Sequence, residues 1–261
     1  MTRITGHRGA RGLWPENSLE GFRKVLALDL DAVEFDVHLA HSGELLVIHD
    51  AILGRTSDGS GPVRDLSPAD RSAIRLNGSD ETIPTLGEVL AVLEPGVGTA
   101  LHVEIKADPN GRSYAGITER VIAEIDRHAV RGRCHLASFD ISVLEHCRDL
   151  APDIPRLVSV DSTHANRQGG LQTFLARVDD LVDIVAIHHG LMDAQWDTIS
   201  ATIAADRLCV WTINEQARIN EWLDRGVGHL TSDRPDIALA LRNARRRPER
   251  TVRGGTRSDE R

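Results

Sequence analysis

Aromatic residues and long apolar runs are both scarce in this chain of 261 residues. Phe, Trp and Tyr together make up 3% of the sequence, and no apolar run approaches the roughly 20 residues of a membrane-spanning helix. The N-terminal sequence MTRITGHRGARG also lacks the apolar stretch of a secretory signal. We therefore expect no transmembrane segment and a cytoplasmic location.

Cysteine is equally rare. The three cysteines, Cys134, Cys147 and Cys209, are odd in number, and each lies in an apolar segment. This pattern predicts free thiols in the core, because a disulfide framework or a cysteine metal site needs paired or closely spaced residues.

Acidic residues outnumber basic ones over residues 1–244 but not at the C-terminal end. The formal net charge is −8 at pH 7, yet residues 245–261, RRRPERTVRGGTRSDER, hold seven arginines and three acidic residues. The acidic remainder argues against nucleic-acid binding. The tail has almost no apolar residues, so we expect it to be disordered, with weak contact to anionic lipid headgroups as the alternative.

Strand-like and helix-like segments alternate along residues 1–244. Eight of each follow one another, which predicts a parallel sheet with right-handed crossovers. A single domain of this size favours a closed (β/α)₈ TIM-type barrel. An open doubly wound sheet is the alternative, but the glycines of GHRGARG do not have dinucleotide-binding spacing. The expected strands are 3–7, 32–37, 101–107, 134–139, 156–160, 184–189, 208–214 and 229–232; the expected helices are 18–28, 85–93, 114–129, 141–150, 170–178, 194–204, 215–225 and 235–244.

One segment interrupts this alternation. A second strand-like run follows strand 32–37, and residues 51–83 after it are polar and rich in turn residues. We interpret 51–83 as a small insertion between the second strand and its helix, on the face where barrel active sites lie.

Three acidic residues lie on two neighbouring predicted strands. Glu34 and Asp36 are two residues apart on one strand, so their side chains share a face, and Glu104 lies near the end of the next. Three such carboxylates would repel one another unless a divalent cation held them, and oxygen ligands favour Mg²⁺, Ca²⁺ or Mn²⁺ over Zn²⁺. The alternative is a metal-free network of ion pairs with Arg8 and Lys106.

Two histidines end strand-like runs at the same predicted rim. His7 and His49 flank the acidic residues and can act as an acid–base pair. Trp211, at the end of a later strand, is a candidate wall for a small organic group, with core packing as the alternative. No nucleophile elbow or Gly-rich phosphate loop with Lys is present, which argues against acyl transfer and nucleotide hydrolysis.

An ordered set of motifs from about residue 4 to residue 241 resembles the glycerophosphodiester phosphodiesterase family. The set comprises GHRGARGLWPENSLEGF, VEFDV, IHD, RTSDGSG, IPTLGEVL, HVEIK, VWTIN and TSDRP. The resemblance implies a (β/α)₈ barrel with a small insertion. It also implies metal-dependent hydrolysis of glycerophosphodiesters to glycerol 3-phosphate and an alcohol.

Carried over by position, the resemblance implies specific roles. His7 and His49 would be the acid–base pair, Arg8 and Lys106 would contact phosphate, and the metal ligands would be Glu34, Asp36 and Glu104. His102 stands where the family commonly has Asn, a departure that bears on metal preference. Cleavage of lysophospholipids at the same site is the alternative activity, and a non-catalytic phosphate binder is a third possibility.

Overall fold

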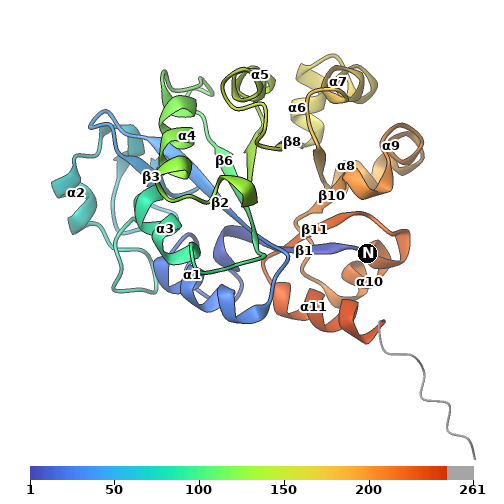
Figure 1. The fold of residues 1–261 in the computed structure, drawn as a ribbon, viewed down its shortest axis with the longest axis horizontal. Coiled ribbons are helices and arrows are strands. Elements are labelled where there is room, and N and C mark those ends of the chain that lie inside the picture. Colours follow the sequence, from blue (N-terminus) through green and yellow to red (C-terminus); the bar gives the residue numbers. More distant parts are fainter. Residues whose placement is uncertain (246–261) are drawn as a thin grey trace, which may run out of the picture.

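The computed structural model describes residues 1–245, so the predicted tail lies, apart from Arg245, outside the described residues. Eight parallel strands form a closed barrel (Figure 1). They are β1 (Arg3–Gly6), β2 (Ala32–Leu39), β6 (Ala100–Ile105), β7 (Cys134–Ser138), β8 (Arg156–Val160), β9 (Ile184–His188), β10 (Leu208–Trp211) and β11 (His229–Ser232). The last strand pairs with the first, Arg3 opposite His229, and β1 also pairs with β2, which confirms the predicted (β/α)₈ barrel.

Helices follow the strands around the barrel, as the apolar periodicity predicts. They are α1 (Leu19–Val25), α3 (Leu86–Leu93), α4 (Ile117–Arg127), α5 (Ile141–Leu150), α6 (Ser162–Arg167), α7 (Leu171–Val178), α8 (His189–Ala194), α9 (Trp196–Thr202), α10 (Gln216–Arg225) and α11 (Pro235–Ala244). Ser18 and Thr85 cap α1 and α3 by accepting backbone N–H bonds, at the starts predicted for these helices. The short helices α6 and α8 were not predicted.

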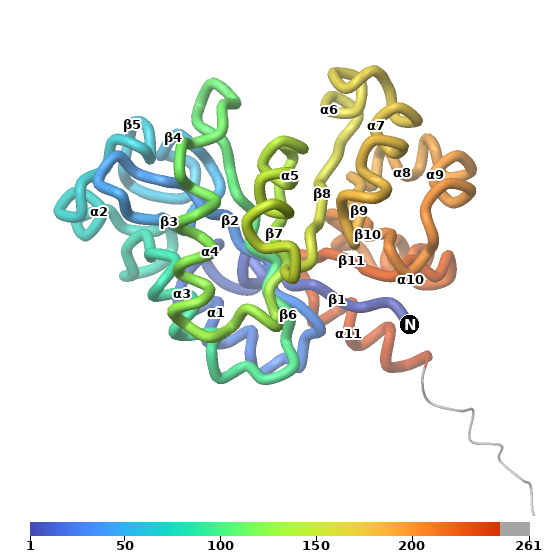
Figure 2. Tube along the Cα trace, turned by 45° about the horizontal axis from the view of Figure 1, so that its top comes forward, coloured from blue at the N-terminus to red at the C-terminus, as the bar shows by residue number. Residues whose placement is uncertain are grey.

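The segment between β2 and α3 has its own small structure. The strand β3 (Leu45–Val47) runs antiparallel to β2, and β4 (Ile52–Leu53) pairs with β5 (Gly61–Pro62) ahead of α2 (Pro68–Ala73). Figure 2 shows these elements grouped on one side of the barrel, next to β2. They enclose a separate apolar cluster that includes Leu46, Ile48, Leu53, Val63 and Ile83.

The end of the barrel opposite the predicted site is tied by one buried guanidinium. Arg242 on α11 pairs with Asp31 just before β2 and donates to the carbonyl of Thr2. The same Asp31 carboxylate accepts the backbone N–H of Ile4 on β1 at 2.8 Å. The final helix therefore holds the first two strands in register. None of the helices in residues 1–245 is long and apolar enough to cross a membrane.

The three cysteines should be inert in the folded protein. All three are free and buried, and burial raises the pKa of each thiol to about 12. Because the thiolate is the reactive form, we expect no reaction with a chromogenic disulfide reagent at pH 8. In guanidinium chloride three thiols per chain should react. Rapid release of the reagent's chromophore by the folded protein would show that the thiols are not buried.

Candidate active site

The predicted site residues gather at the carboxyl-terminal end of the barrel. Glu34 and Asp36 project from β2, and Glu104 on β6 lies directly opposite Asp36 in the strand register. His7 and Arg8 form the short turn that follows β1, and His49 follows β3. Together with Lys106 and Trp211, all of them line one cavity of about 100 Å³.

The turn after β1 has the backbone shape that His7 and Arg8 need. Arg8, Gly9 and Ala10 all have positive φ, and Gly9, at φ +73°, lies against Phe22. A Cβ at position 9 would approach the Phe22 ring to 3.2 Å, so glycine is required there on both counts. This tight turn directs the His7 and Arg8 side chains back over the strand ends.

The three carboxylates converge within the buried cavity. One oxygen from each of Glu34, Asp36 and Glu104 lies within 4.8 Å of the other two. Lys106 Nζ lies 2.7 Å from Glu104 Oε1 and 3.4 Å from Asp36 Oδ1, and Arg8 Nε lies 3.4 Å from Asp36 Oδ2. The predicted metal ligands and the predicted ion-pair partners are thus the same cluster.

Charge is unevenly balanced within this cluster. Burial raises the pKa of Glu34 well above its usual value, and repulsion from Asp36 and Glu104 raises it further. Burial also raises the pKa of Asp36, but Lys106 and Arg8 outweigh it, so that pKa falls far below its usual value. Glu34 is therefore the carboxylate with least compensation from the protein. Three buried oxygen donors with this deficit fit a hard divalent cation.

His7 is held by a carboxylate from the last strand-to-helix connection. Its Nδ1 lies 2.6 Å from Oδ1 of Asp233, and Asp233 also accepts from Arg11 at 2.7 Å and from Asn214 at 2.8 Å. Burial raises the pKa of Asp233, but the hydrogen bonds from His7 and Arg11 and the charges of these two residues together outweigh it, so the pKa lies well below its usual value. The ionised carboxylate can only accept, so His7 Nδ1 carries the hydrogen and Nε2 is left for the cavity.

Burial also governs the charge of His7 itself. Burial lowers the pKa of His7, and the hydrogen bond to Asp233 only partly opposes this effect. The ring is therefore held neutral, with Nε2 3.9 Å from Oε2 of Glu34.

His49 has a matching carboxylate on the other side of the cavity. Its Nδ1 lies 2.6 Å from Oδ1 of Asp50, and Arg55 donates to both oxygens of Asp50. Burial raises the pKa of Asp50, but hydrogen bonds from Arg55 and His49 outweigh it and lower that pKa to about 2. The His49 side chain is 31% exposed, three times as much as that of His7.

The backbone of His49 is braced from below by a buried histidine. His38 Nε2 lies 3.0 Å from the His49 carbonyl oxygen, so Nε2 donates. Nδ1 of His38 must then accept, and the hydroxyl of Tyr114 donates to it at 2.9 Å. Burial lowers the pKa of His38 to about 4, which keeps the ring neutral and this arrangement intact at neutral pH.

Aromatic rings form one wall of the cavity. Trp211 meets Phe139 edge to face at 5.8 Å and His188 at 5.1 Å, at the ends of β7, β9 and β10. A larger groove of about 870 Å³ adjoins the cavity and shares His49, Glu104, Lys106 and Phe139 with it. His102, the departure from the family pattern, lines the cavity below Glu104, and its ring lies 5.0 Å from that of His135.

Several residues of the network were assigned no role from the sequence. Asp233 and Asn214 come from the opposite end of the chain, and Arg11, Glu16 and Arg55 come from loops. Asp233 follows the last predicted strand in the same way that His7 follows the first. That position at a strand end was the available signal.

Comparison with known proteins agrees with this geometry. The model of the glycerophosphoryl diester phosphodiesterase family matches residues 7–237. A glycerophosphodiester phosphodiesterase from Bacillus altitudinis is 30% identical over 253 residues, which cover 93% of this chain and 98% of that protein.

Solved structures share the fold. A crystal structure from Agrobacterium tumefaciens superposes with a TM-score of 0.83 at 27% identity, covering 94% of this chain and 99% of that one. A phosphodiesterase from Oleispira antarctica, in complex with its product sn-glycerol-3-phosphate, has a TM-score of 0.76 at 23% identity, covering 93% and 97%.

Tyr114 offers a direct spectroscopic test of the brace under His49. Burial, and then Asp108, raise its pKa to about 12, and it is the one tyrosine of the chain. Absorbance at 295 nm should show little phenolate in the folded protein at pH 10.5, whereas the unfolded chain should titrate near its usual value of about 10. Stability should fall as pH rises from 10 towards 12, because the unfolded state loses this proton first. Equal titration of the two states would show that the phenol is not buried.

Proposed function

The chain belongs to the glycerophosphoryl diester phosphodiesterase family, and from that premise we propose that it hydrolyses glycerophosphodiesters to glycerol 3-phosphate and an alcohol. The observation that carries the proposal is the convergence of three buried carboxylates between two histidines, each of which is oriented by an aspartate. Residues 1–244 would form the catalytic domain, with a small-molecule substrate and no nucleic-acid partner.

Glu34, Asp36 and Glu104 would hold one divalent cation, Mg²⁺, Ca²⁺ or Mn²⁺. Their three buried oxygens and the incomplete compensation of Glu34 support this assignment. Such a cation, when bound, polarises the phosphoryl group and neutralises negative charge.

Arg8 and Lys106 would supply the remaining positive charge around phosphate. Both side chains line the cavity, and both already lie beside Asp36. Burial opposes the charge of Lys106, but Glu104 and Asp36 raise its pKa above the usual value, so the ammonium persists. Fixed cations in a cavity that excludes most water stabilise charge that grows on the equatorial oxygens in the transition state.

The two histidines would divide the proton transfers according to their surroundings. The buried, neutral His7 accepts the proton of the attacking hydroxyl, either that of water or that of the glycerol next to the ester, at Nε2. His49 is more exposed than His7 and is oriented by the ionised Asp50, and it donates a proton to the departing alcohol. If a cyclic phosphate forms, the two roles reverse for its hydrolysis.

The groove beside His49 would receive the alcohol portion, with Phe139 as its inner wall. Trp211, which packs against Phe139, would line the adjoining cavity. Its lining includes Ile52, Pro109 and Val143, and also four aspartates, Asp50, Asp108, Asp140 and Asp161. A long acyl chain would have to lie against those carboxylates. This lining favours a small polar alcohol over the alternative substrate, a lysophospholipid.

Removing the metal should abolish turnover and lower stability. We expect chelator to stop release of glycerol 3-phosphate from glycerophosphocholine, and a divalent cation to restore it. The same cation should raise the unfolding temperature. At a cation concentration a hundred times Kd, the free energy of unfolding should rise by about 2.7 kcal/mol. Glu104→Gln should lose this thermal shift, whereas the surface variant Glu94→Gln should keep it. Undiminished activity in excess chelator would exclude the metal assignment.

Replacing His49 should act on the chemical step. His49→Ala is expected to lower kcat by about 10² to 10⁴-fold with little change in KM, because a general acid works in the transition state. His146→Ala is the matched control, since that histidine is half exposed, pairs with Glu119, and lines neither the cavity nor the groove. A rise in KM with unchanged kcat would instead make His49 a binding residue.

A further inference from the structure

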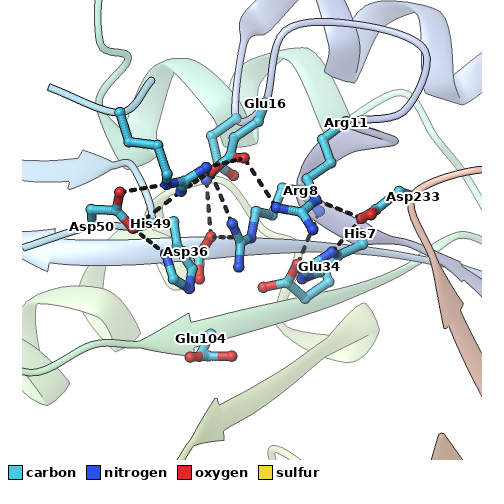
Figure 3. A network of polar contacts seen from close by, with 12 residues as sticks. His7, Arg8, Arg11, Glu16, Glu34, Asp36, His49, Asp50, Glu104 and Asp233 are labelled. Carbon is cyan, nitrogen blue, oxygen red and sulfur yellow. Dashed lines mark hydrogen bonds and ion pairs between the residues drawn. The ribbon is translucent and has the colours of Figure 1, made fainter. Parts of the chain in front are cut away.

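A single carboxylate, that of Glu16, lies between the two histidine–aspartate pairs. Its side chain is 8% exposed, although it comes from the loop between β1 and α1. Three guanidinium groups converge on it. Arg8 lies at 2.9 Å and Arg11 at 3.4 Å (Figure 3), and Arg55 lies at 2.8 and 3.0 Å. Nothing in the proposed chemistry uses this residue directly.

Two of these arginines reach further, one toward each histidine. Arg55 holds both oxygens of Glu16 and both oxygens of Asp50, the partner of His49. Arg11 contacts Glu16 and donates to Asp233, the partner of His7. One continuous chain of contacts therefore joins the two rings, in the order His7, Asp233, Arg11, Glu16, Arg55, Asp50, His49.

The backbone fixes Glu16 at the centre of this chain. Pro15 precedes it, and Asn17, which follows it, has a φ of +56° and is fully buried. The Asn17 side chain donates to Asp36 at 2.9 Å, and its backbone N–H donates to the Arg8 carbonyl at 3.0 Å. The loop is thus anchored to the carboxylate cluster by one residue, while its neighbour holds the arginines.

We propose that Glu16 is a positioning residue that orients both imidazoles at once through Arg11 and Arg55. The inference rests on the proposed function, because it assigns Glu16 a purpose only if His7 and His49 are the acid–base pair. Without Glu16, the 46% exposed Arg55 would keep Asp50 as its one carboxylate partner, and Arg11 would keep only Asp233. Misplacement of a catalytic group by about 1 Å costs on the order of a hundredfold in rate.

Glu16→Gln tests this at constant shape. It keeps the side chain's length but removes its charge and gives it an N–H₂ that faces guanidinium donors. We expect kcat for glycerophosphocholine to fall on the order of a hundredfold with KM little changed. Glu20→Gln is the matched control, because Glu20 lies four residues away and pairs with Lys24 at the surface. A fall in kcat no larger than that of the control would overturn the proposal.

Nitrogen NMR of the histidine rings distinguishes positioning from a general loss of stability. Asp50→Asn should shift the ring ¹⁵N resonances of His49 alone, and Asp233→Asn those of His7 alone. Glu16→Gln should shift both sets while the other ring resonances, such as those of His146, stay in place. A shift confined to one ring, or to neither, would overturn the proposal. If Glu16→Gln does not fold, Arg55→Met must shift the His49 resonances and lower kcat, and failure to do so is equally contradictory.

The kinetic and NMR measurements distinguish a failure of the role of Glu16 from a failure of the proposed hydrolytic function. If both rings respond to Glu16→Gln but the unaltered protein does not hydrolyse any glycerophosphodiester, only the proposed function fails. If the unaltered protein is active and the two rings do not respond together, only the role of Glu16 fails.

Discussion

Repulsion among Glu34, Asp36 and Glu104 is the constraint around which this end of the barrel is built. Three carboxylates within 4.8 Å of one another in a buried cavity are costly to ionise together. The positive charges of Lys106 and Arg8 offset part of this repulsion, and Glu34 is the carboxylate whose negative charge they offset least. Full compensation would favour a closed network of ion pairs, whereas partial compensation leaves room for a cation and a charged substrate. This imbalance is the feature of the cluster that fits a divalent cation.

The barrel brings these charged residues together because its strands come from distant parts of the sequence and end at the same cavity. β2 and β6 place Asp36 opposite Glu104 in register, and closure of β11 onto β1 brings Asp233 to His7 from 226 residues away. Strands do not shift independently once both neighbours are paired. Arg242 adds a tie at the opposite end, where it links α11 to the first two strands. Closure of the barrel at the end near Arg242 therefore helps to keep the hydrogen-bond distances at the carboxyl-terminal end.

The sequence predicted the barrel and the residues that lie at strand ends, because apolar period and strand position are local properties. These two local properties alone predict the eight strands and the convergence of Glu34, Asp36 and Glu104. Helix α6 was missed because six mostly polar residues, Ser162–Arg167, are too short to show a period. Asp233 lay at a predicted strand end, but only barrel closure shows that its partner is His7. Arg55 was missed because its partners are set by loop conformation, which spacing along the chain does not reveal.

One network holds two histidines, His7 and His49, in different surroundings. Each has an ionised aspartate at Nδ1 and an arginine behind that aspartate, so hydrogen bonding alone would make them alike. Burial makes them differ: the His7 side chain is 10% exposed and burial lowers its pKa, whereas the His49 side chain is 31% exposed. Charges alternate along the connecting chain, aspartate, arginine, Glu16, arginine, aspartate, so each ion is flanked by opposite charge. A chain of that kind links the two histidine–aspartate pairs without adding net positive charge beside either ring, and the two rings differ chiefly in their burial.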